Sequence, residues 1–369
     1  MSENISIKKG LLPLSKLYGW VVKGRNKLFD KGVLKSEQFP VPVISVGNLT
    51  VGGTGKTPHT EYLIRLLSKK HKVAVLSRGY KRKTTGFHLA NARSTAQSIG
   101  DEPFQIFRKF PEVTVAVDGN RRRGIHTLLQ LPVNQRPDVI LLDDAYQHRY
   151  VTPSLSILLT NAQRLFSKDA LLPAGRLREP SANSNRANIV ICTKCGTDFS
   201  ANDYHALAQQ IPLTPQQQLY FTNYHYKGLL PVFPDATPVK KENLERLKKE
   251  DYSLLLLAGL AQPEDMKAYL QTYTADLQTL IFPDHHAFSK KDFEHIAAKQ
   301  AAIRNDKKLI ITSEKDAMRL MDNPFMPENL KSQLYYLPIR VAFSNEQDEE
   351  LFVRKIEEHI ANLQVICAC

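Results

Sequence analysis

The segment from Gly47 to Pro58 has the residue types and the spacing of a phosphate-binding loop. Its sequence, GNLTVGGTGKTP, follows a predicted strand and precedes a predicted helix. Closely spaced glycines let the backbone aim N–H groups at phosphate oxygens, and the helix adds the positive end of its dipole. Lys56 can reach the β- and γ-phosphates of a nucleotide, and the Thr57 hydroxyl can coordinate Mg²⁺. The predicted ATP-binding residues are Thr50, Val51, Gly52, Gly53, Thr54, Gly55, Lys56 and Thr57.

Two carboxylates follow a second predicted strand. The apolar run Val139–Leu142 leads directly into Asp143 and Asp144. In such a site Mg²⁺ needs a hard oxygen ligand or an anchored water, which an acid at the end of a buried strand supplies. We therefore predict that Asp143 and Asp144 hold Mg²⁺ together with Thr57. The sequence leaves open which of the two carboxylates touches the metal directly.

A loop of this type occurs in GTPases, in motor ATPases and in small-molecule kinases. The guanine-reading NKxD motif of GTPases is absent from the sequence. Motor ATPases usually need arginine fingers from neighbouring subunits, which one sequence does not exclude. A kinase needs a general base near the γ-phosphate to orient or deprotonate the acceptor hydroxyl. The loop alone therefore leaves the kind of enzyme open.

Composition narrows the class of protein and of partner. The chain has 369 residues, which favours two domains, and a formal net charge of +13, which favours a polyanionic partner such as nucleic acid, an anionic membrane or a phosphorylated substrate. Four cysteines exclude a disulfide scaffold. Zinc bound by these four is disfavoured, because the single CxxC, Cys192 and Cys195, supplies half the ligands. With no apolar run of about 18 residues and no signal-peptide core, we expect a location in the cytoplasm or on the cytoplasmic face of a membrane.

Residues 1–36 form a basic, amphipathic segment. They contain eight basic and two acidic residues, a net charge of +6. On a helical wheel, one broad face is apolar, the opposite face carries Lys16, Lys23 and Lys27, and Arg25 alone interrupts the apolar face. This pattern is typical of an interfacial helix, but it also fits a helix packed on the body of the protein. The apolar positions are Leu14, Leu17, Tyr18, Trp20, Val21, Val22, Leu28 and Phe29.

The rest of the chain predicts an α/β fold. Short apolar runs alternate with amphipathic segments, which indicates a parallel sheet with crossover helices. We predict a P-loop NTPase-type sheet domain and a second, smaller α/β domain, joined by a two-stranded linker with strands near Leu219–Asn223 and Leu229–Phe233. The predicted ranges are 1–36 for the amphipathic helical segment, 37–214 for the P-loop domain, 215–250 for the connector and 251–369 for the second domain, whose C-terminal end is a candidate to return to the first.

Seven motifs follow one another along the chain: VGNLTVGGTGKTP (46–58), LSRGY (76–80), GDEP (100–103), DDAYQHR (143–149), LPAGRLREP (172–180), FPDHH (282–286) and TSEKD (312–316). Together they resemble the lipid A 4′-kinases (tetraacyldisaccharide 4′-kinases) of Gram-negative bacteria. The resemblance covers most of the chain. Thr50, which stands where GxxxxGK[ST] has its first glycine, is normal for this family's loop. Ala145 and Tyr146 are mild departures from the family's Asp-Asp-Gly-Phe-Gln-His.

The resemblance implies transfer of the γ-phosphoryl group of ATP to the 4′-hydroxyl of a tetraacylated glucosamine disaccharide 1-phosphate, with ATP and Mg²⁺ as cofactors. It implies that Asp101 is the base and that His285, or alternatively His286, pairs with it. The role of Thr312–Asp316 stays open. The resemblance also places Arg78, Arg121, Arg178 and Glu179 near the reacting phosphates or the sugar.

A tetraacylated substrate stays in the bilayer, so the resemblance favours the interfacial interpretation of the N-terminal segment. It implies an anionic membrane surface as partner, a location on the cytoplasmic face of the inner membrane, no nucleic-acid partner and a monomer. The alternative, from another class, is a P-loop ATPase regulated by nucleic acid or another polyanion. No nucleic-acid-reading motif or aromatic–basic interleaving supports that alternative.

Overall fold

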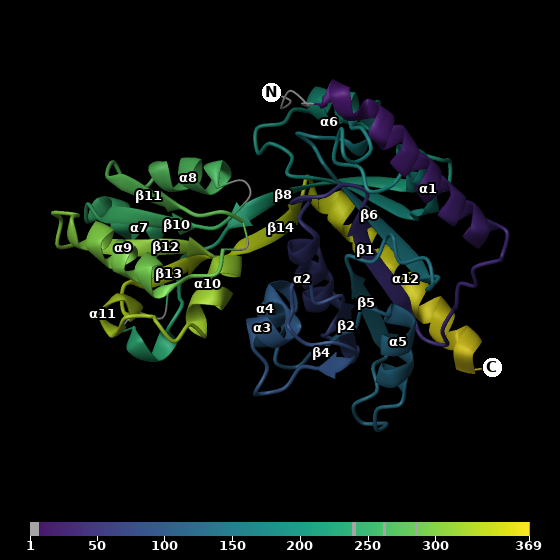
Figure 1. Cartoon of the computed structure of the whole chain (residues 1–369), viewed down its shortest axis with the longest axis horizontal. Helices are drawn as coiled ribbons and strands as arrows, with labels where there is room; N and C mark the ends of the chain where they lie inside the picture. Colours follow the sequence, from purple (N-terminus) through teal and green to yellow (C-terminus); the bar gives the residue numbers. More distant parts are fainter. Residues whose placement is uncertain (1–6, 238–240, 261–262, 285, 369) are drawn as a thin grey trace. The chain divides into compact units, whose positions relative to one another are not determined.

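The computed structural model describes residues 7–237, 241–260, 263–284 and 286–368. The chain forms two compact units (Figure 1). Unit 1 comprises Met1–Arg93, Ile106–Tyr224 and Val341–Cys369, and unit 2 comprises Ser94–Gln105 and His225–Arg340. Three of the boundaries fall inside regular elements, namely the helix α4 (Asp101–Lys109) and the strands β8 (Gln218–Tyr226) and β14 (Ile339–Phe343).

Unit 1 is built on a nine-stranded sheet. From β8 to β4 all neighbouring strands pair in parallel, and β3 pairs antiparallel to β4 at one edge. Every residue of β1, β2, β5, β6 and β7 is buried, as expected for strands covered on both faces. In sheet order the strands are β14, β8, β7 (Ile189–Thr193), β6 (Leu155–Asn161), β1 (Val43–Asn48), β5 (Val139–Asp143), β2 (Val73–Ser77), β4 (Thr114–Val117) and β3 (His88–Leu89).

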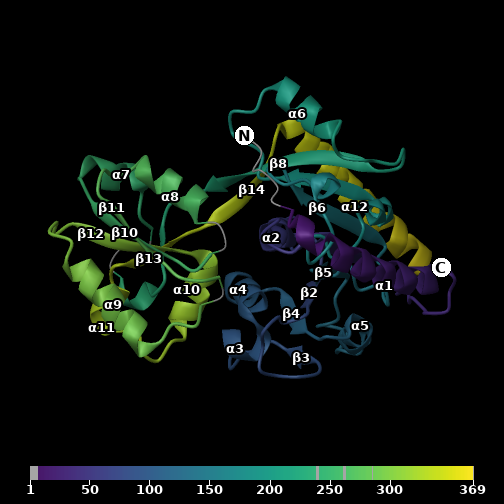
Figure 2. The same ribbon diagram turned by 45° about the horizontal axis from the view of Figure 1, so that its top comes forward.

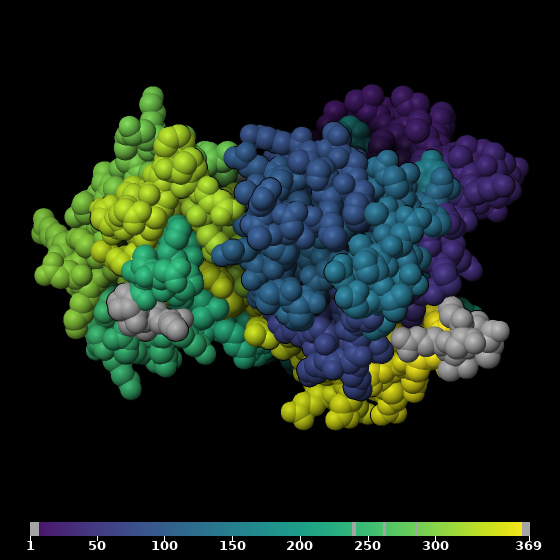
Figure 3. All heavy atoms as spheres, turned by 90° about the horizontal axis from the view of Figure 1, so that it is seen from below, coloured from purple at the N-terminus to yellow at the C-terminus, as the bar shows by residue number. Residues whose placement is uncertain are grey.

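Helices cover both faces of this sheet. On one face α2, the C-terminal helix α12 and the end of α4 share a core cluster, and on the other face α5 packs through Ile125 and Leu128. Figure 3 shows α12 lying alongside α2 at the surface of unit 1. The helices of this unit are α1 (Leu12–Asp30), α2 (Lys56–Leu67), α5 (Arg121–Leu129), α6 (Ala201–Ala208) and α12 (Glu346–Ala368), with short 3₁₀ helices η1 (Lys9–Leu11), η2 (Phe166–Lys168) and η3 (Ser181–Arg186).

Unit 2 has its own five-stranded sheet and its own core. The first four strands pair in parallel, and β9 closes the sheet antiparallel to β13. In order the strands are β11 (Leu277–Ile281), β10 (Ser253–Ala258), β12 (Lys308–Ser313), β13 (Leu334–Leu337) and β9 (Leu230–Pro231). Its helices are α3 (Ala96–Ile99), the start of α4, η4 (Pro234–Ala236), α7 (Leu244–Lys249), α8 (Glu264–Gln271), α9 (Lys290–Ala301), α10 (Glu314–Met321) and α11 (Glu328–Lys331).

The predicted α/β architecture is confirmed, with one correction to the linker. The segment Leu229–Phe233, predicted as the second linker strand, contains only the two-residue strand β9, which belongs to the sheet of unit 2. Pro231 lacks a backbone donor, which keeps this strand short and at the sheet edge. The second strand that crosses between the units is β14, far along the sequence.

None of the helices within the described residues combines the length and the hydropathy needed to cross a membrane.

The packing of α12 on unit 1 yields a stability prediction. Phe352 is 1% exposed and contacts the rings of Tyr62, Tyr220 and Phe343, whereas its neighbour Leu351 is 42% exposed. We expect Phe352→Ala to lower the free energy of unfolding by about 3–5 kcal/mol, because it leaves a cavity in the core. Leu351→Ala should change it by less than about 0.5 kcal/mol. Urea denaturation followed by circular dichroism measures both, and equal losses would contradict this packing.

Candidate active site

The phosphate-binding loop joins β1 to α2, and glycines stand where its backbone requires them. Gly52 and Gly55 have φ of 110° and 84°, which other residues rarely adopt. A Cβ on Gly55 would also lie 1.7 Å from the Tyr224 hydroxyl oxygen. Thr50 forms a backbone bridge with Leu177 and has no positive φ, so this position does not require the glycine of the usual pattern.

Neighbouring segments hold the loop from two sides. The Val51 N–H donates to the Arg176 carbonyl at 2.8 Å, which ties the loop to the 172–180 motif. Behind the loop, Thr54 is buried, and its hydroxyl accepts a hydrogen bond from the Asn48 side-chain amide at 2.7 Å. The Thr193 hydroxyl donates to the Thr54 carbonyl at 2.9 Å. The protein's own hydrogen bonds therefore hold the backbone of the loop.

His59 is a loop-supporting residue that sequence reasoning missed. Its Nδ1 lies 2.8 Å from the Gly55 carbonyl oxygen, and its Nε2 lies 3.0 Å from the Thr222 hydroxyl on β8. The carbonyl can only accept, so Nδ1 carries the proton and Nε2 accepts from Thr222. Burial lowers the pKa of His59 to about 4, so the ring stays neutral. The one sequence feature that could have indicated this role is the position of His59 four residues after Gly55, which is about one helical turn.

Asp143 and Asp144 lie at the end of β5, beside the strand that enters the loop. The parallel register pairs Val46 with Asp143. Asp143 is buried and accepts a hydrogen bond from the Thr60 hydroxyl at 3.1 Å. Asp144 lies 3.8 Å from the Lys56 ammonium and 2.8 Å from Nη2 of Arg178. Burial by itself would raise the pKa of Asp144, but Lys56 and then Arg178 outweigh it and hold the carboxyl below its usual range.

Three cations act on Asp144, and a fourth lies near one of them. The three are Lys56, Arg178 from the 172–180 motif and Arg121 at the start of α5, and Arg78, which follows β2, interacts with Arg121. Arg121 is 3% exposed, and burial lowers its pKa to about 10. Among the described residues, Nε of Arg121 and Nε of Arg178 have no hydrogen-bond partner. An excess of positive charge with unpaired donors fits a polyphosphate.

The same place fits Mg²⁺. No group of three or more His, Cys, Asp or Glu side chains within the described ranges could hold a metal by itself. Mg²⁺ bound with a nucleotide keeps waters and phosphate oxygens and takes one or two carboxylates from the protein. Thr57, at the start of α2, together with Asp143 and Asp144, offers the oxygen ligands that this ion prefers.

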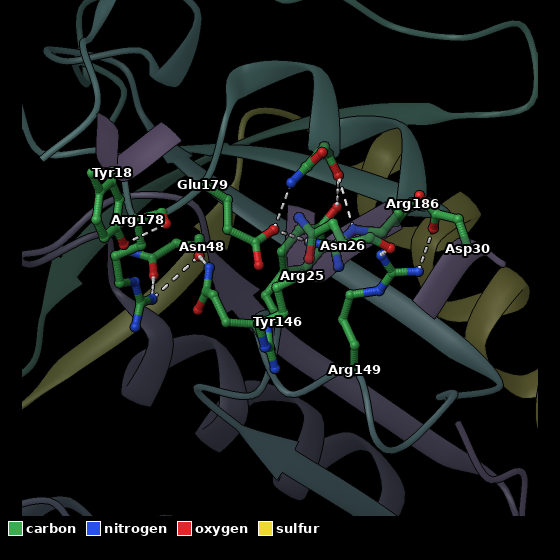
Figure 4. Close-up of polar contacts among 12 residues, drawn as sticks. Tyr18, Arg25, Asn26, Asp30, Asn48, Tyr146, Arg149, Arg178, Glu179 and Arg186 are labelled. Atoms are coloured by element: carbon green, nitrogen blue, oxygen red, sulfur yellow. Dashed lines mark hydrogen bonds and ion pairs between the residues drawn. The ribbon is translucent and has the colours of Figure 1, made fainter. Parts of the chain in front are cut away.

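Glu179 is held by two residues that follow it closely in the sequence. It is 1% exposed, forms an ion pair with Arg186, and accepts a hydrogen bond from the Asn183 side chain at 2.9 Å (Figure 4). Its Oε1 has no hydrogen-bond partner within the described part of the chain. Tyr146 supports the group, because its hydroxyl donates to the Asn183 carbonyl at 2.7 Å and its ring lies under Arg186.

The 143–149 motif also links α1 to the site. The Gln147 side chain donates to the Asn48 carbonyl at 2.7 Å, and the Gln147 carbonyl accepts from Arg25 of α1 at 3.4 Å. Arg149 donates to the Asn26 carbonyl and pairs with Asp30 (Figure 4). Arg25 thus interrupts the apolar face of the predicted helix because it turns toward the body of unit 1.

The helix α1 lies against the rest of unit 1 (Figure 2). It packs through a narrow strip and leaves much of its apolar face exposed. Ser15 and Gly19 are buried, and the Ser15 hydroxyl donates to the Leu171 carbonyl at 2.9 Å. The Tyr18 hydroxyl donates to the Arg178 carbonyl at 2.8 Å. The exposed apolar residues of the helix are Leu12 (38%), Leu14 (55%), Leu17 (58%), Trp20 (72%), Val21 (67%) and Leu28 (43%).

Asp101 belongs to unit 2, at the first position of α4. Gly100 before it has a φ of 95°, which explains the glycine of the Gly-Asp-Glu-Pro motif. Arg319 of α10 pairs with Asp101 at 2.7 Å. The predicted partner His285 lies outside the described residues. His286, the predicted alternative, makes a contact with Asp292 at 3.0 Å and stacks on Phe282.

Cys192 and Cys195 of the predicted CxxC are buried, reduced cysteines. The hydrogen bond between the pair and then burial raise the pKa of the Cys192 thiol. The side chains of Cys367 and Cys369 lie outside the described part of the structure.

Comparison with known proteins adds evidence that is independent of this geometry. The family model described as tetraacyldisaccharide-1-P 4′-kinase matches residues 7–359. The tetraacyldisaccharide 4′-kinase of Parabacteroides distasonis is 50% identical over 367 residues, covering 99% of each chain. That of Bacteroides fragilis (strain ATCC 25285) is 51% identical over 353 residues, covering 94% of this chain and 93% of the relative. A crystal structure of LpxK from Aquifex aeolicus in complex with ATP is similar at a TM-score of 0.72, with 29% identity, covering 96% of this chain and 99% of that chain.

The neutral His59 makes stability depend on pH. Because the folded state lowers its pKa from 6.5 to about 4, unfolding takes up a proton between these values, and stability falls as the pH falls through them. The substitution His59→Gln keeps a donor and an acceptor but removes the titrating group. Between pH 7.5 and 5, we expect the free energy of unfolding of the parent protein to fall by about 2 kcal/mol more than that of His59→Gln. Urea denaturation at both pH values measures this. His148, whose pKa also falls to about 4, stays in both proteins, so an identical pH dependence would contradict the assignment.

Proposed function

The chain belongs to the tetraacyldisaccharide-1-P 4′-kinase family of ATP-dependent kinases, and from this membership we propose its reaction and its site residues. The reaction transfers the γ-phosphoryl group of ATP to the 4′-hydroxyl of a tetraacylated glucosamine disaccharide 1-phosphate. The product is the bisphosphorylated lipid of lipid A and lipopolysaccharide biosynthesis. The single observation that carries the proposal is the glycine loop of unit 1 beside two carboxylates and the cations Lys56, Arg121 and Arg178.

The loop residues 50–57 bind the triphosphate, and Lys56 contacts the β- and γ-phosphates. Thr57, Asp143 and Asp144 hold Mg²⁺, which neutralises charge on the phosphates when it is bound. Asp144 suits this role because Lys56 and Arg178 keep it ionised. The family's motifs support Arg78, Arg121, Arg178 and Glu179 as contacts to the reacting phosphates or the sugar.

In the proposed reaction, Asp101 accepts the proton of the 4′-hydroxyl. The hydroxyl oxygen forms a bond to the γ-phosphorus, while the bond between that phosphorus and the β,γ-bridging oxygen breaks and ADP leaves. His285 would orient Asp101 or share its proton. The engagement of His286 with Asp292 favours His285 over its neighbour for this task.

We further propose that α1 binds the cytoplasmic face of the inner membrane, where a tetraacylated lipid resides. The exposed Leu17, Trp20 and Val21 would enter the acyl boundary, and the lysines of residues 1–36 would face anionic headgroups. The sequence of this segment fits either an interfacial helix or a helix packed on the body of the protein. The arrangement of α1 supports each interpretation in part, because one strip packs on unit 1 and another is exposed. No observation on the described residues favours the alternative of a polyanion-regulated ATPase.

The reaction is tested by incubating the protein with [γ-³²P]ATP, Mg²⁺ and a disaccharide-1-phosphate lipid in detergent. We expect a labelled bisphosphorylated product. Asp101→Ala should lower kcat by two or more orders of magnitude, roughly the contribution of a positioned base, while ATP affinity changes little. Near-normal turnover would remove Asp101 from the base role, and absence of the product from the parent protein would refute the proposed reaction.

The membrane role is tested on α1 with Leu17→Gln, Trp20→Gln and Val21→Gln combined. We expect the triple variant to lose sedimentation with anionic vesicles and turnover of vesicle-bound lipid, but to keep its turnover of lipid in detergent micelles. Deleting residues 1–36 would also remove the bonds of Ser15 and Tyr18, so the substitutions are the sharper test. Exposed Val133 and Leu213, changed to Gln together, serve as the control. Unchanged sedimentation of the triple variant would refute the membrane role.

A further inference from the structure

The Thr312–Asp316 motif builds a rigid end to β12 in unit 2. Its hydroxyl and carboxylate side chains are buried, and Asp316 is fully so. The Thr312 hydroxyl donates to the Leu257 carbonyl of β10 at 2.8 Å. Ser313 caps α10, because its hydroxyl accepts from the Asp316 N–H at 3.0 Å. These contacts fix the first turn of α10 relative to the sheet.

Asp316 is completely engaged by donors from three directions. Its Oδ2 accepts from the Gly259 N–H at 2.9 Å and from the Ser313 hydroxyl at 2.7 Å. Its Oδ1 accepts from Nη1 of Arg319 at 2.7 Å, one turn further along α10. A buried carboxylate needs such partners to remain charged. The direction of the Arg319 side chain is therefore set by a buried carboxylate that is itself held by Gly259 and Ser313.

The same guanidinium reaches Asp101. Its Nε and Nη2 both donate to Oδ2 of Asp101, at 2.8 and 2.7 Å, while Nη1 stays on Asp316. Arg319 is 8% exposed on its side chain and Asp101 21%, so water screens the pair only weakly. A planar fork that holds two carboxylates at once is specific to arginine, because lysine offers a single point charge.

We propose that Arg319, oriented by Asp316, is a positioning residue that holds the Asp101 carboxylate in its catalytic orientation. The inference rests on the proposed role of Asp101 as base, and it gives the Thr312–Asp316 motif a task. The buried Asp316 anchors the guanidinium of Arg319, and this guanidinium fixes one oxygen of Asp101. The Thr312 hydroxyl ties the end of β12 to β10, and the Ser313 hydroxyl donates to Asp316. Asp101 is thereby placed by a segment more than 200 residues away in sequence.

The first test is the effect of Arg319→Met and Arg319→Lys on kcat and KM in the detergent assay. We expect Arg319→Met to lower kcat about 10- to 100-fold, as misplacement of a catalytic group does, with KM for ATP unchanged. Arg319→Lys should recover part of the loss, and Asp316→Asn should lower kcat in the same way as Arg319→Met. Thermal melting curves show whether each variant is folded. If Arg319→Met does not fold, Arg319→Lys and Asp316→Asn provide the same comparison.

The matched control is Lys315→Met. Lys315 lies on the same helix and pairs with Glu102, the neighbour of Asp101, at 3.2 Å. It therefore joins α10 to the start of α4 through the residue that follows the proposed base. We expect kcat of Lys315→Met to stay within about threefold of the parent. Equal losses in Lys315→Met and Arg319→Met would mean that Arg319 only joins the two helices, which would overturn the inference.

The decisive test combines Arg319→Met with Asp101→Ala. If Arg319 acts through Asp101, adding Arg319→Met to Asp101→Ala should change the residual kcat by less than about twofold. The reason is that substitutions of residues that act through the same group do not have additive effects. Losses that multiply would overturn the inference while leaving Asp101 as base. Near-normal turnover of Asp101→Ala alone would overturn the proposed base and, with it, this inference.

Discussion

The parallel pairing of β1 with β5 is the constraint on which the rest of unit 1 depends. It brings the end of the strand that enters the phosphate loop next to the end of the strand that carries Asp143 and Asp144. Both strands are buried on both faces, so a shift of register would expose apolar residues and separate the loop from its carboxylates. The glycine loop, the acids and the helix dipole of α2 thus follow from one pairing.

The buried charged groups at this sheet edge stabilise one another. Asp144 sits beside Lys56 and Arg178, and these cations overcome the cost of its burial. Arg121, buried at the start of α5, is stabilised in turn by Asp144. Among the described residues, the Nε donors of Arg121 and Arg178 have no hydrogen-bond partner, so the cluster can bind a further anion. A site with these properties favours a ligand that carries several negative charges, as ATP does.

The supporting residues come from segments that are distant in sequence. The Gly55 carbonyl is held by His59, which is held by Thr222 on β8, a strand that continues into unit 2. In unit 2, Asp101 is held by Arg319 of α10. The loop and the proposed base are thus each oriented by a partner that forms no recognisable motif. Such supporting contacts decide how precisely a reacting group is placed.

The sequence by itself determined which chemical groups the protein can use. Short stretches of sequence suffice to recognise the phosphate loop, the acids after Val139–Leu142, the alternation of strands and helices, and the motifs of the family. The tertiary structure decided which partners orient these groups. His59 with Thr222 and Asp101 with Arg319 are separated by 163 and 218 residues. The sequence offered the return of the C-terminal end to unit 1 only as a candidate, and periodicity could not predict that β14 makes that return or that α1 buries Ser15 and Gly19 while exposing Trp20. Local patterns report backbone conformation and burial over a few turns, whereas these contacts depend on the path of the whole chain.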